Sequence, residues 1–205
     1  MKKLLILGGS SYLLPAIRAA HELGIYVITA DYLPDNIAHK YSDEYHNVSI
    51  IDKDAILQLA EDLQIDGIVS YATDPGVVVA AYVAEKLGLP TSPYKSVKIL
   101  QNKGKFREFL RDNNFNVPYS ETFKEYSEVE LSKFKFPIIV KPVDSAGSKG
   151  VTRVDDETAL RAAFEYALKY SITGEVIIEE FIEKKGYSTD TDSFSIDGKV
   201  GFATF

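Results

Sequence analysis

Three things that this sequence lacks narrow its function. It contains no cysteine, so disulfides, thiolate metal sites and cysteine nucleophiles are excluded. No apolar run approaches the roughly 20 residues of a membrane-spanning helix. The apolar run near the N-terminus, Leu4–Leu7, ends at Gly8-Gly9 and is too short for the hydrophobic region of a signal peptide. We therefore expect a cytoplasmic protein with no membrane partner.

A net positive charge is also missing. The 23 lysines and arginines are outnumbered by 30 acidic residues, which gives a net charge of -7. Such a surface should repel nucleic acid and anionic lipid, so we expect no nucleic-acid partner. A phosphate-bearing ligand would need lysines gathered at one place. With 205 residues, 45% of them hydrophobic, the chain can form one large domain or two small ones.

The first ninety residues alternate between strand-like and helix-like segments. Apolar, β-branched runs predict buried strands, and each is followed by a segment with helical periodicity. This alternation is typical of a doubly wound parallel sheet, in which ligands bind at the carboxyl ends of the strands. The predicted strands are Leu4–Leu7, Ile25–Ala30 and Gly67–Ser70, the predicted helices are Leu13–Leu23, Asp52–Leu63 and Asp74–Leu87, and the strand-end loops are Gly8–Tyr12, Asp31–Asp35 and Tyr71–Asp74.

Particular residues mark the ends of these helices. Pro15 is compatible with the first turn of the first helix, and Gly24 and Gly88 are expected stops. Asp52 is the expected N-cap of the second helix. Asp74-Pro75 is interpreted as the cap and first position of the third.

The rest of the chain predicts a second unit after a boundary near Thr91-Ser-Pro93. A polar helical stretch, Ser96–Asn113, is expected first, either as one helix or as two short ones. We assign residues 1–92 to the doubly wound domain, 93–123 to a helical connector, 124–190 to a small α+β lobe and 191–205 to the start of a further lobe. The small lobe is predicted to contain a strand at Pro137–Val140, a helix from an Asp155 cap to Tyr170, and a strand at Glu175–Phe181. A hairpin is predicted after it, with strands Ser193–Ile196 and Lys199–Phe205 joined by the turn Asp197-Gly198.

The most informative segment is Phe136–Val151. A β-branched run ends at Lys141, and the loop after it holds Ser145, Gly147, Ser148, Lys149 and Gly150. Glycines let backbone N–H groups approach a ligand, while the serine hydroxyls and the lysines add donors and positive charge. This combination suits a phosphate chain. An ordinary solvated turn stays open as the alternative.

The loop Gly8-Gly9-Ser10-Ser11 follows the first strand and opens the first helix, so its amides could hold an anion. Asp31 lies 23 residues after Gly8, where a dinucleotide-binding fold keeps its ribose-binding acid. The glycine fingerprint G-x-G-x-x-G fails, however, at Ser10 and Leu13. A nicotinamide oxidoreductase, a general strand-end ligand loop and a structural turn all stay open.

Two further pairs of residues are ambiguous by themselves. Asn102-Lys103 lies in the helical connector, where a lysine is usually solvated. Glu179-Glu180 ends a predicted strand, so the two side chains should point to opposite faces. One of these two carboxylates could therefore face inward.

Taken together, these segments resemble the ATP-grasp superfamily. Asn102-Lys103, Phe136–Pro142, Ser145–Gly150 and Glu179–Ile182 have its order and spacing, and the preceding domain resembles its usual N-terminal partner. The closest similarity is to carbamoyl-phosphate synthase large chains, phosphoribosylglycinamide synthetases and related carboxylate–amine ligases. The resemblance implies an ATP-dependent ligase that phosphorylates a carboxylate and lets an amine attack the acyl phosphate. The expected partners are thus a small-molecule carboxylate and amine.

The resemblance also implies roles for individual residues. Lys103 and Lys141 would hold the α- and β-phosphates of ATP. The loop Ser145–Gly150 would be mobile and would close over the phosphates. Glu179 would accept from the adenine amino group, the backbones of Glu180 and Ile182 would contact the purine edge, and Phe181 would line the pocket. The catalytic residue stays unknown. The loop residues implied in ATP binding are Ser145, Gly147, Ser148 and Gly150, and the residues expected near the substrate are Gly8, Gly9, Ser10, Ser11, Asp31, Thr73 and Asp74.

The sequence departs from the family pattern at two points. Gly186 stands where relatives place a ribose-binding glutamate, with Glu183 and Tyr187 nearby. The family's Mg²⁺ ligands would lie beyond residue 205, so we expect no metal site in this chain. The active site would then be truncated, and we expect no turnover by the chain alone. A homo-oligomer or a separate chain could complete the site. A non-catalytic nucleotide-binding or regulatory module therefore stays open as a second class.

Overall fold

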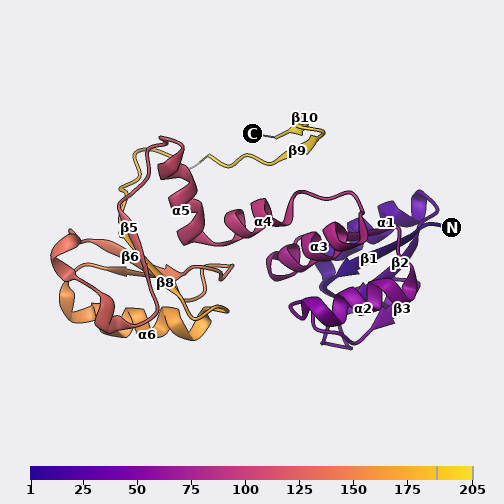
Figure 1. Ribbon diagram of the computed structural model, residues 1–205, viewed down its shortest axis with the longest axis horizontal. Helices are drawn as coiled ribbons and strands as arrows, with labels where there is room; N and C mark the ends of the chain where they lie inside the picture. The colour runs from indigo at the N-terminus through magenta and orange to yellow at the C-terminus, as the bar shows by residue number, and fades with distance from the viewer. Residues whose placement is uncertain (188, 205) are drawn as a thin grey trace.

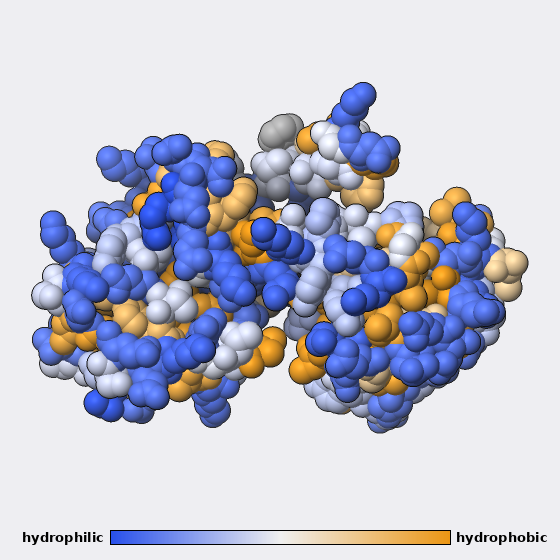
Figure 2. Space-filling view, viewed as in Figure 1, coloured by the Kyte–Doolittle hydropathy of each residue, from blue (hydrophilic) through white to orange (hydrophobic). Residues whose placement is uncertain are grey.

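The computed structural model describes residues 1–187 and 189–204. Phe205, which we predicted within the last strand, lies outside the described residues. Figure 1 shows two bodies joined by a helical segment, with a separate hairpin near the C-terminus. Hydrophilic residues cover much of the face seen in Figure 2. Within the described part of the chain, no helix has both the length and the hydropathy needed to cross a membrane.

The first body is built on a parallel four-stranded sheet. Its strands are β1 (Lys3–Leu7), β2 (Tyr26–Ala30), β3 (Glu44–His46) and β4 (Gly67–Val69), in the order β3-β2-β1-β4. One face packs against the short 3-10 helices Ser11–Leu13 and Ile37–Lys40 and against α1 (Leu14–Glu22). The other face packs against α2 (Lys53–Leu63) and α3 (Asp74–Leu87). The predicted doubly wound sheet is confirmed.

The helix ends follow local chemistry. The Asp52 carboxylate accepts from Ala55 N, which confirms this cap, and Gly88 ends α3 with φ of +66°. The N-cap of α3 is Thr73, and Asp74 is already the first helical residue. The prediction of Asp74 as the cap was therefore wrong by one position.

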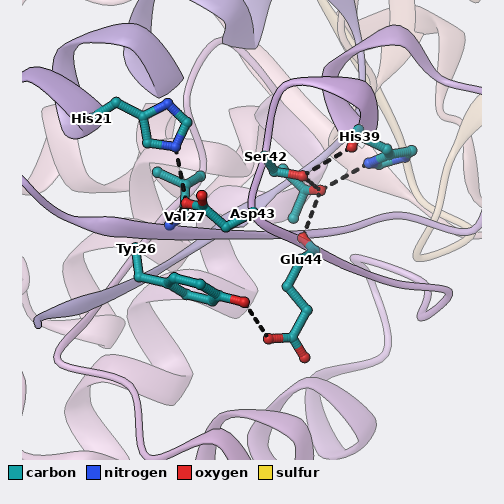
Figure 3. Close-up of polar contacts among 8 residues, drawn as sticks. His21, Tyr26, Val27, His39, Ser42, Asp43 and Glu44 are labelled. Carbon is teal, nitrogen blue, oxygen red and sulfur yellow. Dashed lines mark hydrogen bonds and ion pairs between the residues drawn. The ribbon is translucent and has the colours of Figure 1, made fainter.

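Strand β3 was not predicted, and it is held beside β2 by side-chain contacts (Figure 3). Thr29 Oγ1 lies 2.9 Å from His39 Nδ1 and 2.8 Å from Ser42 Oγ, and it donates to the Glu44 carbonyl at 3.4 Å. Val27 N donates to Asp43 Oδ2 at 2.7 Å, and His21 Nε2 lies 2.9 Å from the same oxygen. These contacts help to hold a strand of only three residues beside β2.

The pKa of Asp43 should make this part of the fold sensitive to acid. The Val27 amide, and then the His21 ring, lower the pKa of Asp43 below its ordinary value. A lowered folded-state pKa stabilises the protein above the unfolded value of about 4, and this contribution is lost as pH falls through the folded pKa. We expect Asp43→Asn to lower Tm at neutral pH, with a difference that shrinks in acid. Thermal unfolding across pH tests this, with the exposed Asp35→Asn as control. A Tm difference that is independent of pH would contradict it.

The second body contains an antiparallel sheet and one covering helix. Strands β5 (Ser120–Phe123), β6 (Ile138–Pro142), β7 (Thr152–Val154) and β8 (Val176–Glu180) lie in the order β5-β8-β6-β7. Helix α6 (Leu160–Tyr170) covers one face, where Ile138, Val140, Phe164 and Ile178 are buried. Asp156, not the predicted Asp155, caps the 3-10 turn before α6. Strand β7 was not predicted.

The two bodies are linked by α4 (Tyr94–Gln101) and α5 (Lys103–Asp112), so the predicted helical stretch forms two short helices and not one. The hairpin of β9 (Ser193–Ile196) and β10 (Lys199–Ala203) is also confirmed. All of its strand residues are exposed, including the apolar side chains of Phe194, Ile196 and Phe202. The domain boundaries stay predictions, although β5 pairs with β8 inside the sheet of the small lobe.

Candidate functional site

The two predicted phosphate-binding lysines lie near each other, where α5 meets the small lobe. Lys141 is in β6, and Lys103 is the first residue of α5, whose N-cap Asn102 accepts from Lys105 N at 3.0 Å. Lys103 N donates to the Val143 carbonyl at 2.8 Å, and Lys103 Nζ donates to the Ser145 carbonyl at 2.7 Å. Lys103 is thus attached to the segment that leads from β6 into the glycine-rich loop.

Lys103 is one of two cations that lie near each other in a partly buried place. Burial, followed by the nearby positive charge of Lys141, lowers the pKa of Lys103 below its ordinary value. The carboxylates of Asp144, Glu179 and Asp74 partly oppose this shift. Two cations that repel each other in a partly buried place favour a ligand of opposite charge. A phosphate chain supplies that charge.

Glu179 is buried between two cations. The residue is 6% exposed, and its two oxygens contact different cations: Oε1 is paired with Lys141 Nζ and Oε2 accepts from Arg107 Nε at 3.2 Å. Glu180 is exposed and points to the other face of β8. The predicted alternation of these two carboxylates is confirmed.

A hollow of about 350 Å³ adjoins this ion-pair network. Four of the predicted base-binding residues line it together, because the end of β8 and the segment after it form one wall. Phe181 in this wall also contacts the guanidinium of Arg153, which lies 4.4 Å from its ring centroid. An apolar hollow with a buried carboxylate is a suitable place for a flat base that carries N–H donors. The lining residues are Arg107, Leu110, Asn116, Val117, Pro118, Ile139, Glu179, Glu180, Phe181 and Ile182.

The sequence analysis missed several of these lining residues. Arg107 is four residues after Lys103, so both side chains lie on one face of α5. This spacing was available as a signal. The contribution of Ile139 and Val117 depends on how the strands pack, and no local pattern indicated it.

The predicted phosphate loop has the backbone that its glycines suggested. Gly147, Ser148 and Gly150 have φ of +64°, +57° and +75°, a conformation that can direct backbone N–H groups toward an anion. The base of the loop is fixed by Asp144. Its carboxylate accepts from Ile172 N at 3.0 Å and from Thr173 N at 2.7 Å. The tip of the loop, by contrast, is exposed.

Two glycines of this loop should differ in their tolerance of alanine. Both have positive φ, which costs a residue with a Cβ about 1–2 kcal/mol. A Cβ at Gly150 would also lie 2.8 Å from Pro142 Cγ, whereas a Cβ at Gly147 would meet nothing within 4 Å. We expect Gly150→Ala to lower the free energy of unfolding by about 1–3 kcal/mol more than Gly147→Ala does. Urea unfolding of the two variants measures the difference, and equal losses would contradict it.

The strand-end loops of the first body also come together in part. Gly8 has φ of +116°, and a Cβ there would lie 3.0 Å from Thr73 Oγ1, so the loops after β1 and β4 are in contact. Asp31 is 7% exposed and its Oδ1 accepts from Leu33 N at 2.9 Å. Gly9 packs against His39, a neighbour that the sequence analysis missed.

The remaining predicted substrate residues lie around these loops. Ser10 precedes the 3-10 helix, and Ser11 is exposed in it. Asp74 shares a cavity of about 220 Å³ with Asp144, between the first body and the small lobe. Among residues 1–187 and 189–204, no group of three His, Cys, Asp or Glu side chains could hold a metal ion.

Comparison with known families agrees with this geometry. The model described as D-ala D-ala ligase C-terminus matches residues 83–189, which is more than half of the chain. The model described as ATP-grasp N-terminal domain matches residues 17–91. The first covers the lysines, the glycine-rich loop and the Glu179 hollow, and the second covers most of the parallel sheet domain.

Individual relatives share less than a third of their aligned residues with this chain. The formate-dependent phosphoribosylglycinamide formyltransferase of Bacteroides thetaiotaomicron is 29% identical over 89% of this chain and 48% of its own length. The enzyme of that name from Burkholderia vietnamiensis is 28% identical over 88% of this chain and 46% of its own length. The chain thus spans about half the length of the curated relatives it matches.

Solved structures show the same partial coverage. The phosphoribosylglycinamide synthetase of Anaerococcus prevotii has a TM-score of 0.69 and 26% identity, over 98% of this chain and 50% of that one. The L-amino acid ligase of Bacillus licheniformis has the same TM-score and identity, over 89% of this chain and 44% of that one.

These comparisons decide the family but not every detail of the predicted resemblance. They give no support to a nicotinamide oxidoreductase or to a non-catalytic regulatory module, and the special similarity to carbamoyl-phosphate synthase stays a prediction. The family model over residues 83–189, the N-terminal model and the solved relatives agree on one assignment. This chain belongs to the ATP-grasp ligases, in the family described by the D-ala D-ala ligase C-terminus.

Proposed function

We propose that this chain binds ATP between α5 and the small-lobe sheet, as part of a ligase that joins a carboxylate to an amine. One observation carries the proposal. Lys103, which bonds to the Ser145 carbonyl at the start of the glycine-rich loop, lies near Lys141, and Glu179, which is paired with Lys141, lines a hollow large enough to receive a base. The proximity of these cations to a carboxylate that borders a hollow supports the proposal.

The proposed pose follows from this arrangement. The base lies in the hollow against Phe181 and Ile182, with its 6-amino group toward Glu179. The phosphates extend toward Lys141 and Lys103, and the loop Ser145–Gly150 covers them and excludes water.

The proposed reaction has two steps. A carboxylate oxygen attacks the γ-phosphorus of ATP, the bond to the β-phosphate oxygen breaks, and ADP leaves. The amine then attacks the carbonyl carbon of the acyl phosphate, inorganic phosphate leaves, and the nitrogen loses a proton. Lys103 and Lys141 stabilise negative charge on the phosphates during the first step. The fold family implies Mg²⁺, but the described residues offer no metal site, so no step through a metal is assigned to them.

The substrates are assigned only by chemical class. The strand-end loops at Gly8–Ser11, Asp31 and Thr73–Asp74 are proposed to contact the carboxylate substrate. Asp74 lines the cavity that it shares with Asp144, the residue directly before the glycine-rich loop. The position of Asp74 near the start of the glycine-rich loop supports this proposal.

Calorimetric titration of the chain with ATP tests the binding site. We expect saturable ATP binding that inorganic tripolyphosphate displaces, and a failure to bind ATP would overturn the proposed site. ADP release by the gene product, purified as its own cell makes it, tests the ligase reaction with Mg²⁺ and panels of carboxylates and amines. ATP binding without ADP release under any of these combinations would favour a binding module over a ligase.

A further inference from the structure

Arg107 occupies a place in the site that the proposed reaction has not used. It lies one helical turn after Lys103 on α5, and its side chain is 22% exposed. The helix can approach the sheet closely because Gly104 faces β5. A Cβ at that position would lie 2.5 Å from Thr122 Oγ1. The close approach brings the Arg107 guanidinium to Glu179 Oε2.

The two oxygens of the Glu179 carboxylate contact two different cations. Its Oε1 is paired with Lys141, which the proposed function assigns to the phosphates, and its Oε2 accepts from Arg107. Bound phosphates attract Lys141 and compete with Glu179 for it. A carboxylate this buried needs a partner that the phosphates do not take. Arg107 is the second cation paired with it.

Arg107 also belongs to the base hollow rather than to the phosphate loop. It lines that hollow with Glu179, Ile139 and Phe181, whereas Lys103 bonds to the Ser145 carbonyl. A guanidinium stays protonated and holds a carboxylate in a fixed plane more firmly than an ammonium does. Its location and its chemistry therefore both favour a role in orienting Glu179.

We propose that Arg107 is a positioning residue for base selection, which keeps the Glu179 carboxylate directed into the hollow while Lys141 serves the phosphates. An ionised carboxylate only accepts hydrogen bonds. It favours a purine with a 6-amino group and repels one with a 6-oxo group. The inference rests on the proposed function, since it presupposes that the base lies beside Glu179.

The test compares three ligands on the 205-residue chain. Arg107→Met keeps an unbranched apolar stem and removes the charge. Arg111→Met is the matched control, because Arg111 lies one turn further along α5 and contacts Ser120 at 3.4 Å. Calorimetry with ATP, inosine triphosphate and inorganic tripolyphosphate separates base recognition from phosphate binding. Inosine triphosphate differs from ATP in carrying a 6-oxo group.

We expect Arg107→Met to lower ATP affinity about tenfold and to reduce the preference for ATP over inosine triphosphate by a similar factor, the scale of one charge-assisted contact. Tripolyphosphate affinity should stay within about twofold of the unsubstituted chain. Arg111→Met should change none of these. Arg107→Lys keeps the charge without the planar fork, so its ATP affinity should lie between those of Arg107→Met and the unsubstituted chain. Arg107→Lys serves in place of Arg107→Met if that variant does not fold.

Two outcomes would overturn the role of Arg107. Equal losses for all three ligands would make Arg107 a general phosphate attractor, and an unchanged ATP preference would make its contact with Glu179 structural only. A different outcome overturns the proposed function itself, namely an unsubstituted chain that folds but binds no ATP. The failures of the two proposals are therefore distinguishable.

Discussion

Replacing Lys141 with methionine weakens ATP binding by about 2–3 kcal/mol, which is roughly a 30- to 150-fold rise in Kd. The Lys141 side chain is only 15% exposed, so little bulk water screens its attraction for a phosphate. Methionine keeps the apolar stem in place and removes the ammonium. Calorimetric titration with ATP measures the change.

The control for this prediction is Lys169→Met, because Lys169 is exposed in α6 of the same lobe. That variant should bind ATP with unchanged affinity. Tripolyphosphate should lose affinity for the Lys141 variant as well, since the lysine is assigned to the phosphates. An unchanged Kd for ATP would remove Lys141 from the site.

Replacing Glu179 with leucine should cause the largest loss of stability, about 3 kcal/mol in the free energy of unfolding. The substitution leaves Lys141 and Arg107 next to each other, both largely buried and both without the carboxylate that separates them. Like charges that have lost their shared partner destabilise the folded state. Urea unfolding followed by circular dichroism measures the loss.

Glu180→Leu is the matched control, because Glu180 is the next residue of β8 and is exposed. Its effect should stay within about 0.5 kcal/mol. The double variant Glu179→Leu/Lys141→Met should recover part of the lost stability, since one of the two unpaired cations is gone. A loss below about 1 kcal/mol for Glu179→Leu would show that the network contributes little to folding.

The sequence was informative where local chemistry decides the structure. Apolar runs such as Leu4–Leu7 formed strands, Asp52 capped its helix, and Asp197-Gly198 formed the hairpin turn. Among the strands that were not predicted, Glu44–His46 and Thr152–Val154 have three residues each. Segments so short carry no measurable periodicity, and contacts such as that of Thr29 with Ser42 hold one of them in place.

The site also contains residues that local sequence predicts and residues that only the packing of the fold brings together. The lysines and the glycine-rich loop could be predicted, because phosphate binding demands particular residue types at close spacing. Arg107 could be placed on the face of α5 that carries Lys103, but the sequence does not say which strand that face meets. The pairing of Arg107 with Glu179 spans 72 residues. Such a contact depends on the packing of α5 against the sheet, which Gly104 permits.

The shared carboxylate of Glu179 constrains the order in which this site can change during evolution. A variant that loses Glu179 while both cations remain is destabilised, whereas a variant that has already lost one of the cations is destabilised less by the loss of Glu179. Lineages that abandon adenine recognition should therefore have replaced Arg107 or Lys141 before Glu179. The effect of each substitution depends on which of the other two residues is still present, so the three positions are expected to vary together rather than independently.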